Sequence, residues 1–161
     1  MNPPKIQRLT SSSALPASLR GAVVAIGNFD GVHRGHQAVL EFAIGEAARR
    51  GVPAIVLTFE PHPRVVFRPD TPLFRITSAP VRARLLAELG FAAVIEQPFT
   101  RDFASLSASE FVDDVLVEDL GACHVVTGYN FHFGKDRKGD PEFLREAGLR
   151  TGFGVSQIEA F

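Results

Sequence analysis

The sequence predicts an α/β fold with a Rossmann-like parallel sheet and helices on both of its faces. Short, almost entirely apolar runs of strand length alternate along the chain with longer runs of helical periodicity, and no tandem repeat interrupts them. The chain has 161 residues, 45% of them hydrophobic and 22% charged, which is the size and composition of one globular domain. Alternation of this kind favours a parallel sheet joined by right-handed crossovers.

Five apolar segments are predicted as strands. The first, AVVAIG, contains no polar side chain, which is typical of a strand that is buried on both faces. The expected strands are residues 22–27, 53–59, 92–97, 122–128 and 153–161, and the last of them runs to the final residue.

Four segments are predicted as helices: residues 36–51, 78–90, 107–121 and 139–152. The third opens with Ser107 and Glu110 at the spacing of a capping box, and Asp140 followed by Pro141 is a typical start for the fourth. Three apolar residues of the second helix share one face: Val81, Leu85 and Leu89. Three residues of the third helix are expected to point inward: Phe111, Val115 and Leu116. Three phenylalanines at periodic positions are assigned to the core: Phe42, Phe59 and Phe143.

Open α/β folds bind their ligands at the carboxyl ends of the strands. Four loops of this chain are expected at that end of the sheet: residues 27–36, 60–76, 98–106 and 128–140. We therefore expect the chemistry of the protein in these four loops.

The loop after the first strand carries the motif H-x-G-H. A turn from a strand into a helix is a natural phosphate site, because free N–H groups and the positive end of the helix dipole face the ligand. The glycines at 27, 31 and 35 do not fit G-x-G-x-x-G, and no lysine lies between Lys5 and Lys135 to complete a Walker loop. His33 and His36 are expected near one face of the first helical turn, and Gly35 lets a phosphate approach the backbone. The motif alone leaves a structural alternative open, in which one histidine caps the turn and the other packs in the core.

Charge and cysteine content restrict the possible partners. The formal net charge is −1, from 17 basic and 18 acidic residues, so we expect no binding to nucleic acid. No segment approaches the roughly 20 apolar residues of a membrane span, so we expect no membrane partner. The single cysteine, Cys123, fits a reducing compartment. We expect a cytoplasmic protein in which residues 1–21 form a polar lead-in to one domain of residues 22–161.

Four segments resemble, in the same order, the motifs of one enzyme family. GNFDGVHRGH, residues 27–36, resembles the signature of the HxGH nucleotidyltransferase superfamily. TFEPHP, FRITS and VVTGYNFHFGKDRKGD resemble later motifs in the adenylyltransferase module of bacterial FAD synthetases, also called bifunctional riboflavin kinase/FMN adenylyltransferases. The match covers almost all of residues 22–155, and it implies the nucleotidyltransferase α/β phosphodiesterase type of fold.

The resemblance implies an FMN adenylyltransferase, or FAD synthase, that uses ATP, FMN and Mg²⁺ and releases FAD and pyrophosphate. It implies catalytic roles for His33 and His36, which would contact the ATP phosphates. It implies ATP-phosphate binding by Gly27, Asn28, Phe29 and Gly35. It implies FMN binding by His62, Phe67, Asn130 and Phe133, and it assigns no metal ligand to the protein.

In the family, a Ser/Thr-rich turn followed by an arginine lies beyond the fifth strand, and a riboflavin kinase domain follows. The sequence contains neither, so we expect a domain that is incomplete at its C-terminus, with impaired activity and a missing kinase partner. Two alternatives stay open: another HxGH adenylyltransferase, acting on pantetheine phosphate or nicotinamide mononucleotide, and a non-catalytic module that binds a nucleotide or flavin. The EPHP and GYNFHFG segments argue against the first of these.

Overall fold

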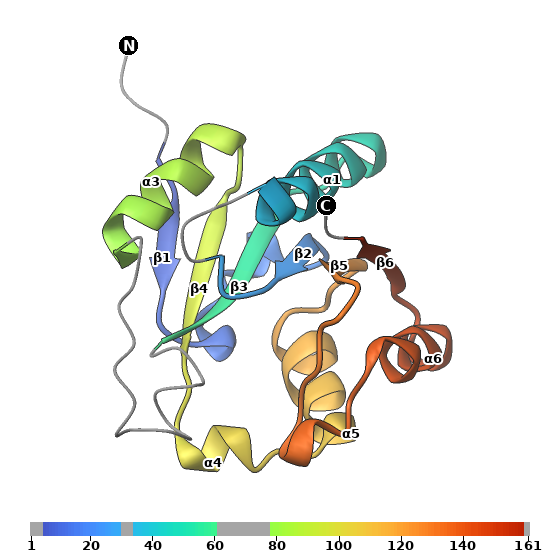
Figure 1. Ribbon diagram of the computed structural model, residues 1–161. Helices are drawn as coiled ribbons and strands as arrows, with labels where there is room; N and C mark the ends of the chain where they lie inside the picture. Colours follow the sequence, from blue (N-terminus) through green and yellow to red (C-terminus); the bar gives the residue numbers. More distant parts are fainter. Residues whose placement is uncertain (1–4, 30–33, 61–77, 160–161) are drawn as a thin grey trace.

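The computed structural model describes residues 5–29, 34–60 and 78–159, and its centre is a six-stranded parallel sheet (Figure 1). The strands are β1 (Gln7–Leu9), β2 (Val23–Ile26), β3 (Ala54–Glu60), β4 (Ala93–Pro98), β5 (His124–Gly128) and β6 (Gly154–Ile158). Their order across the sheet is β1-β4-β3-β2-β5-β6, and every neighbouring pair is parallel. The predicted fold class is confirmed.

Helices cover both faces of this sheet. α1 (Arg34–Arg50) and α3 (Ala79–Leu89) lie on one face, and η4 (Phe111–Asp119) and α6 (Pro141–Thr151) lie on the other (Figure 1). Short helical turns join these elements: η1 (Ser12–Ala14), η2 (Ala17–Leu19), α4 (Arg101–Ala104), α5 (Ala108–Glu110) and η5 (Lys135–Arg137). In the described parts of the chain, no helix is both long and apolar enough to cross a membrane.

Each face of the sheet has its own buried core. Val23 and Ala25 of β2 belong to the apolar cluster that contains residues of α1 and α3, whereas Val24 and Ile26 belong to the cluster that contains residues of η4 and α6. Successive side chains of a strand point to opposite faces, so a strand of four apolar residues needs helices on both sides. β2, the all-apolar strand predicted at residues 22–27, is therefore a central strand of a sheet that is covered on both faces.

The sheet has one strand more than the sequence predicts. β1 lies within the expected lead-in, at the edge of the sheet, where Arg8 Nε donates to Glu96 Oε1 of β4 at 3.1 Å. β1 has three residues, two of them exposed, so hydrophobic periodicity does not reveal it. β6 is shorter than expected, because it ends at Ile158 rather than at the last residue.

Two predictions about buried helix faces are wrong. Phe42 is 41% exposed, because the inward stripe of α1 consists of Val39, Leu40, Ala43 and Ala47. Val81 of α3 is also exposed, and that helix buries Arg82, Ala83, Leu86 and Ala87 instead. Because an arginine occupies this buried face, the spacing of apolar residues does not indicate it. Phe59 is buried as predicted, and Phe143 is partly buried against the core.

The segment predicted as one helix over residues 107–121 contains two elements. Ser107 Oγ accepts from the Glu110 N–H and Glu110 Oε1 accepts from the Ser107 N–H, each at 3.0 Å, so the predicted capping box starts α5. The chain then continues as a π-helix, η4, a rare form that is frequent at functional sites. Its three inward residues are buried as predicted: Phe111, Val115 and Leu116.

Candidate functional site

The candidate site lies at the topological switch point of the sheet. From β2 the chain builds the sheet in one direction through β3 and β4, and it then returns to add β5 and β6 on the other side of β2. Asn28 follows β2 and Asn130 follows β5, so both residues lie beyond the carboxyl ends of two paired strands. The crevice outside these strand ends is where open α/β sheets bind ligands.

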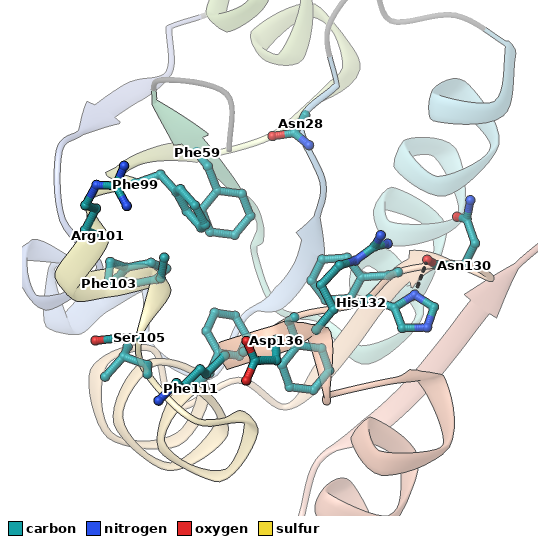
Figure 2. A pocket seen from close by; sticks show the side chains of 17 residues that line it. Asn28, Phe59, Phe99, Arg101, Phe103, Ser105, Phe111, Asn130, His132 and Asp136 are labelled. Atoms are coloured by element: carbon teal, nitrogen blue, oxygen red, sulfur yellow. Dashed lines mark hydrogen bonds between the residues drawn. The ribbon is translucent and has the colours of Figure 1, made fainter. Parts of the chain in front are cut away.

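A pocket of about 920 Å³ opens at this end of the sheet. Figure 2 shows Phe59, Phe99 and Phe103 on one side of it and His132 with Asn130 on the other. The lining residues come from the turn after β2, from β3, from residues 99–111 and from residues 130–137. The predicted meeting of the loops 98–106 and 128–140 at one end of the sheet is confirmed.

Phenylalanine rings form most of the pocket wall. The lining includes six of them: Phe59, Phe99, Phe103, Phe111, Phe131 and Phe133. The ring centroids of Phe59 and Phe99 are 5.8 Å apart, and those of Phe111 and Phe133 are 5.2 Å apart. Phe131 and Phe133 stack with an angle of 17° between their planes. A wall of this kind suits a flat and mainly apolar ring system.

Polar groups lie among and beside these rings. Three cationic side chains line the pocket, Arg101, Lys135 and Arg137, and all three are exposed to solvent. Asn28 Oδ1 is buried and makes no hydrogen bond within the described residues. His132 Nδ1 donates to the carbonyl oxygen of Asn130 at 2.9 Å (Figure 2). The pocket thus offers three cations and one carboxylate, that of Asp136, at solvent-exposed positions.

The turn after β2 packs three of the predicted ATP-site residues together. Phe29 has a φ of 52°, and its ring is buried over Gly27, where a Cβ would lie 2.9 Å from Phe29 Cζ. The ring of Phe29 meets the imidazole of His36 edge to face, with centroids 5.5 Å apart and an angle of 79°. Glycine at residue 27 therefore makes room for Phe29, and Phe29 contacts the histidine in the first turn of α1.

The structure brings together only part of the predicted site. Asn28, Asn130 and Phe133 line the pocket, and Phe133 is almost fully buried there. Gly35 is described only as backbone in the first turn of α1. Three predicted residues lie outside the described residues: His33, His62 and Phe67. Within the described segments, no group of three or more His, Cys, Asp or Glu residues is arranged to hold a metal ion.

Comparison with known proteins now decides the family. Residues 15–161 match the family model described as FAD synthetase. The chain belongs to the FAD synthetase family. A relative in this family from Pseudomonas fluorescens, a bifunctional riboflavin kinase/FMN adenylyltransferase, is 48% identical over 140 residues, which are 87% of this chain and 45% of the relative. The protein of the same name from Escherichia coli strain K12 is 40% identical over 145 residues, which are 90% of this chain and 46% of the relative.

The chain spans about half the length of the curated relatives that it matches. Among solved structures, it is similar to a macrolide-efflux protein from Streptococcus pneumoniae, with a TM-score of 0.79 and 26% identity. That match covers 94% of this chain and 49% of the other. The arrangement of the sheet and its helices thus has a close counterpart in a solved structure.

Several residues of the pocket are not predicted from the sequence. Phe59 and Phe111 are assigned to the core, but each is both buried and part of the pocket lining. Phe99 and Phe103 receive no role, although both lie in the loop 98–106 that is expected at the site. Two phenylalanines near the carboxyl end of a strand were the available signal. Phenylalanine composition alone does not separate a pocket wall from a core.

Proposed function

We propose that this chain is an FMN adenylyltransferase domain, which transfers AMP from ATP to FMN and releases FAD and pyrophosphate. The observation that carries the proposal is the aromatic pocket at the switch point, because the turn after β2 both lines it with Asn28 and holds His36 through Phe29. Membership of the family and the names of the relatives support the same activity.

FMN has the chemistry that this pocket offers. Its isoalloxazine ring is flat and aromatic, and phenylalanine side chains bind such rings by stacking and by edge contacts. Its phosphate carries negative charge, which suits Arg101, Lys135 and Arg137. A volume of about 920 Å³ is within the range of small-molecule sites.

The reaction joins two phosphates directly. An oxygen of the FMN phosphate attacks the α-phosphorus of ATP, and the bond from that phosphorus to the bridging oxygen breaks, so pyrophosphate leaves with the electron pair. Positioning and charge stabilisation supply most of the catalysis in such transfers. We assign His36, together with His33, to donate hydrogen bonds to the ATP phosphates as negative charge develops on them. Mg²⁺ enters with the substrate, bound to the phosphates of ATP.

We also infer the setting of this domain. A riboflavin kinase produces FMN, the acceptor, and the names of the relatives include that activity, so a kinase of this kind is the expected partner. Residues 22–161, with β1 as an edge strand, are our proposal for the adenylyltransferase domain. The single cysteine, Cys123, is free, which fits the cytoplasm as its compartment.

FAD formation by this chain is the direct test. The protein is incubated with MgATP and FMN, and FAD and pyrophosphate are measured beside the His36→Ala variant. We expect equal amounts of the two products, and a rate about 100-fold lower in the variant, because one preorganised donor has been removed. Binding of both substrates without pyrophosphate release would contradict the proposal and favour a non-catalytic module. Pyrophosphate release with pantetheine phosphate or nicotinamide mononucleotide, but not with FMN, would favour another adenylyltransferase.

A second test concerns the pocket itself. Phe103→Ala removes one ring of the pocket wall, and Phe42→Ala removes an exposed ring of α1 as the matched control. In titrations followed by FMN fluorescence, we expect the Kd of the Phe103 variant to rise about tenfold, which corresponds to about 1.4 kcal/mol. The control keeps the wild-type Kd. Equal FMN affinity in all three proteins would show that FMN does not bind in this pocket.

A further inference from the structure

Arg82, in the first turn of α3, is fully buried. Its side chain is 0% exposed, although arginine is almost never fully buried without partners. Burial removes a guanidinium group from water, and an apolar residue of similar volume in such a position is often neutral or stabilising. Stability alone therefore does not explain an arginine at this position. Its hydrogen bonds and ion pairs indicate its role.

These contacts join the carboxyl ends of two neighbouring strands. Arg82 Nη1 donates to the carbonyl oxygen of Asn28, just beyond β2, at 3.2 Å. Arg82 Nη2 donates to Oε1 of Glu60, the last residue of β3, at 2.7 Å. The same Nη2 lies 3.6 Å from Oε2 of Glu96 on β4. One guanidinium group thus connects α3 to the strand end that lines the pocket.

The bond to Asn28 acts on the peptide that precedes Phe29. The Asn28 carbonyl oxygen also accepts from Thr58 Oγ1 at 3.2 Å, so donors from α3 and β3 together hold the plane of this peptide. Phe29 has a φ of 52°, and a residue other than glycine keeps such an angle only where its surroundings impose it. A rotation of the Asn28–Phe29 peptide changes this angle directly, because φ is measured from that peptide.

We propose that Arg82 is a positioning residue for the transfer reaction. Its hydrogen bond holds the Asn28–Phe29 peptide, Phe29 then keeps its conformation, and the Phe29 ring contacts the His36 imidazole at 5.5 Å between centroids. The proposal rests on the proposed function, in which His36 binds the ATP phosphates. Arg82 does not line the flavin pocket, so its loss lowers kcat and leaves the KM for FMN almost unchanged.

Four variants separate this role from a purely structural one. Arg82→Met removes both hydrogen bonds but keeps an unbranched apolar chain, and Arg82→Lys keeps a cation and a donor. Thr58→Val removes the other donor to the Asn28 carbonyl at nearly constant volume. Arg8→Ala is the matched control, because Arg8 pairs with Glu96 in the same ionic network without a contact to Asn28.

Steady-state kinetics give the first readout. We expect kcat to fall at least about tenfold in Arg82→Met, because small displacements of a catalytic group have effects of this size or larger, while the KM for FMN changes less than about threefold. Arg82→Lys recovers part of the lost kcat, and Thr58→Val shows a smaller loss in the same direction. Arg8→Ala keeps the wild-type kcat.

The proton NMR signals of the His36 imidazole give a readout that needs no activity. They are assigned by their loss in His36→Gln, and they report the position of the Phe29 ring through its ring current. We expect them to shift in Arg82→Met and to stay in place in Arg8→Ala. If the wild-type chain forms no FAD, the proposed function fails, while these signals still test whether Arg82 positions His36.

Wild-type kcat together with unshifted His36 signals in Arg82→Met overturns the proposal. An equal loss of kcat in Arg8→Ala also overturns it, because the effect then belongs to the ionic network as a whole. If Arg82→Met does not fold, Arg82→Lys and Thr58→Val decide the matter by the same two measurements, and wild-type values in both reject the role.

Discussion

Gly134 shows at the scale of one residue how tightly the pocket loop approaches its neighbours. Its φ is 77°, and a Cβ there would lie 2.7 Å from the backbone nitrogen of Ala108. The next residue, Lys135, donates its N–H to the Leu106 carbonyl oxygen at 2.7 Å, so the loop is tied to the segment before α5. A side chain at residue 134 would have to separate these two parts of the pocket wall.

Gly134→Ala tests this close approach against Gly51→Ala. Gly51 has a similar φ of 69°, but a Cβ there meets nothing within 4 Å. Gly51→Ala therefore carries the strain of a positive φ, about 1–2 kcal/mol, without a clash. Gly134→Ala adds an overpacking cost of about 1–3 kcal/mol to the strain of its own backbone, whose φ of 77° and ψ of 172° are open essentially only to glycine. Urea unfolding of both variants measures the difference. Equal losses of unfolding free energy would show that the loop moves away from Ala108 at no cost.

Residues of the site differ in how far the sequence predicts them. Asn28, Asn130 and Phe133 stand in motifs next to strand ends, and the structure puts all three in the pocket lining. Arg82 carries no such signal, because its burial depends on carboxylates at residues 60 and 96 that only the fold brings near it. Sequence patterns record chain neighbours, whereas a buried charge is decided by partners that are distant in the chain.

At the scale of elements, the capped start of α5 fixes where the π-helix begins, and the first residue of that helix lines the pocket. Ser107 and Glu110 form reciprocal hydrogen bonds at this start, and η4 begins at Phe111, one of the rings in the pocket wall. Accepting the Ser107 N–H also lowers the pKa of the Glu110 carboxyl below 4.5. The cap thus fixes the point from which the π-helix runs.

Ser107→Ala removes the cap, and Ser109→Ala, at an exposed position within the same short helix, is the control. We expect the first to lower the free energy of unfolding by about 1 kcal/mol, a typical value for an N-cap. The second is expected to be neutral or slightly stabilising, because alanine favours helix more than serine does. Thermal and urea denaturation of both variants measure these changes. Similar effects in the two variants would mean that the Ser107 hydroxyl contributes little.

The local sequence predicts some helices and strands of this fold and not others. β2 is predicted because an all-apolar run has no other stable place than a covered sheet. β1 is not, because its pairing with β4 depends on an available sheet edge rather than on its own residues. The buried face of α3 is displaced from the predicted one because Arg82 occupies an inward position.

At the scale of the whole molecule, His124 links folding stability to pH. It is buried on β5, where Nδ1 accepts from Arg50 Nη2 of α1 at 3.2 Å and Nε2 donates to Ser156 Oγ of β6 at 2.8 Å. Burial lowers the pKa of His124 below 6.5, and the charge of Arg50 lowers it further. The folded protein therefore binds a proton at His124 more weakly than the unfolded chain does.

The sign of the pH effect follows from this lowered pKa. The unfolded chain takes up the proton near pH 6.5, before the folded chain does, so the free energy of unfolding falls as the pH drops from about 6.5 to the folded pKa and then levels off. Urea unfolding between about pH 5 and pH 7.5 measures the slope. We expect a smaller slope in His124→Gln, with His132→Gln, at an exposed histidine, as the control. An unchanged slope in the His124 variant would assign the pH dependence to other groups.

The sequence by itself determined the α/β class, the central strands, the capping box and the end of the sheet at which the site lies. These features depend on local periodicity, on local hydrogen bonds and on the rule that parallel strands share a carboxyl edge. Only the tertiary structure decided that Phe59, Phe103 and Phe111 form one pocket wall and that Arg82 holds the Asn28 peptide. Both results require side chains from distant segments to meet, and the energy of such contacts exists only once the chain has folded.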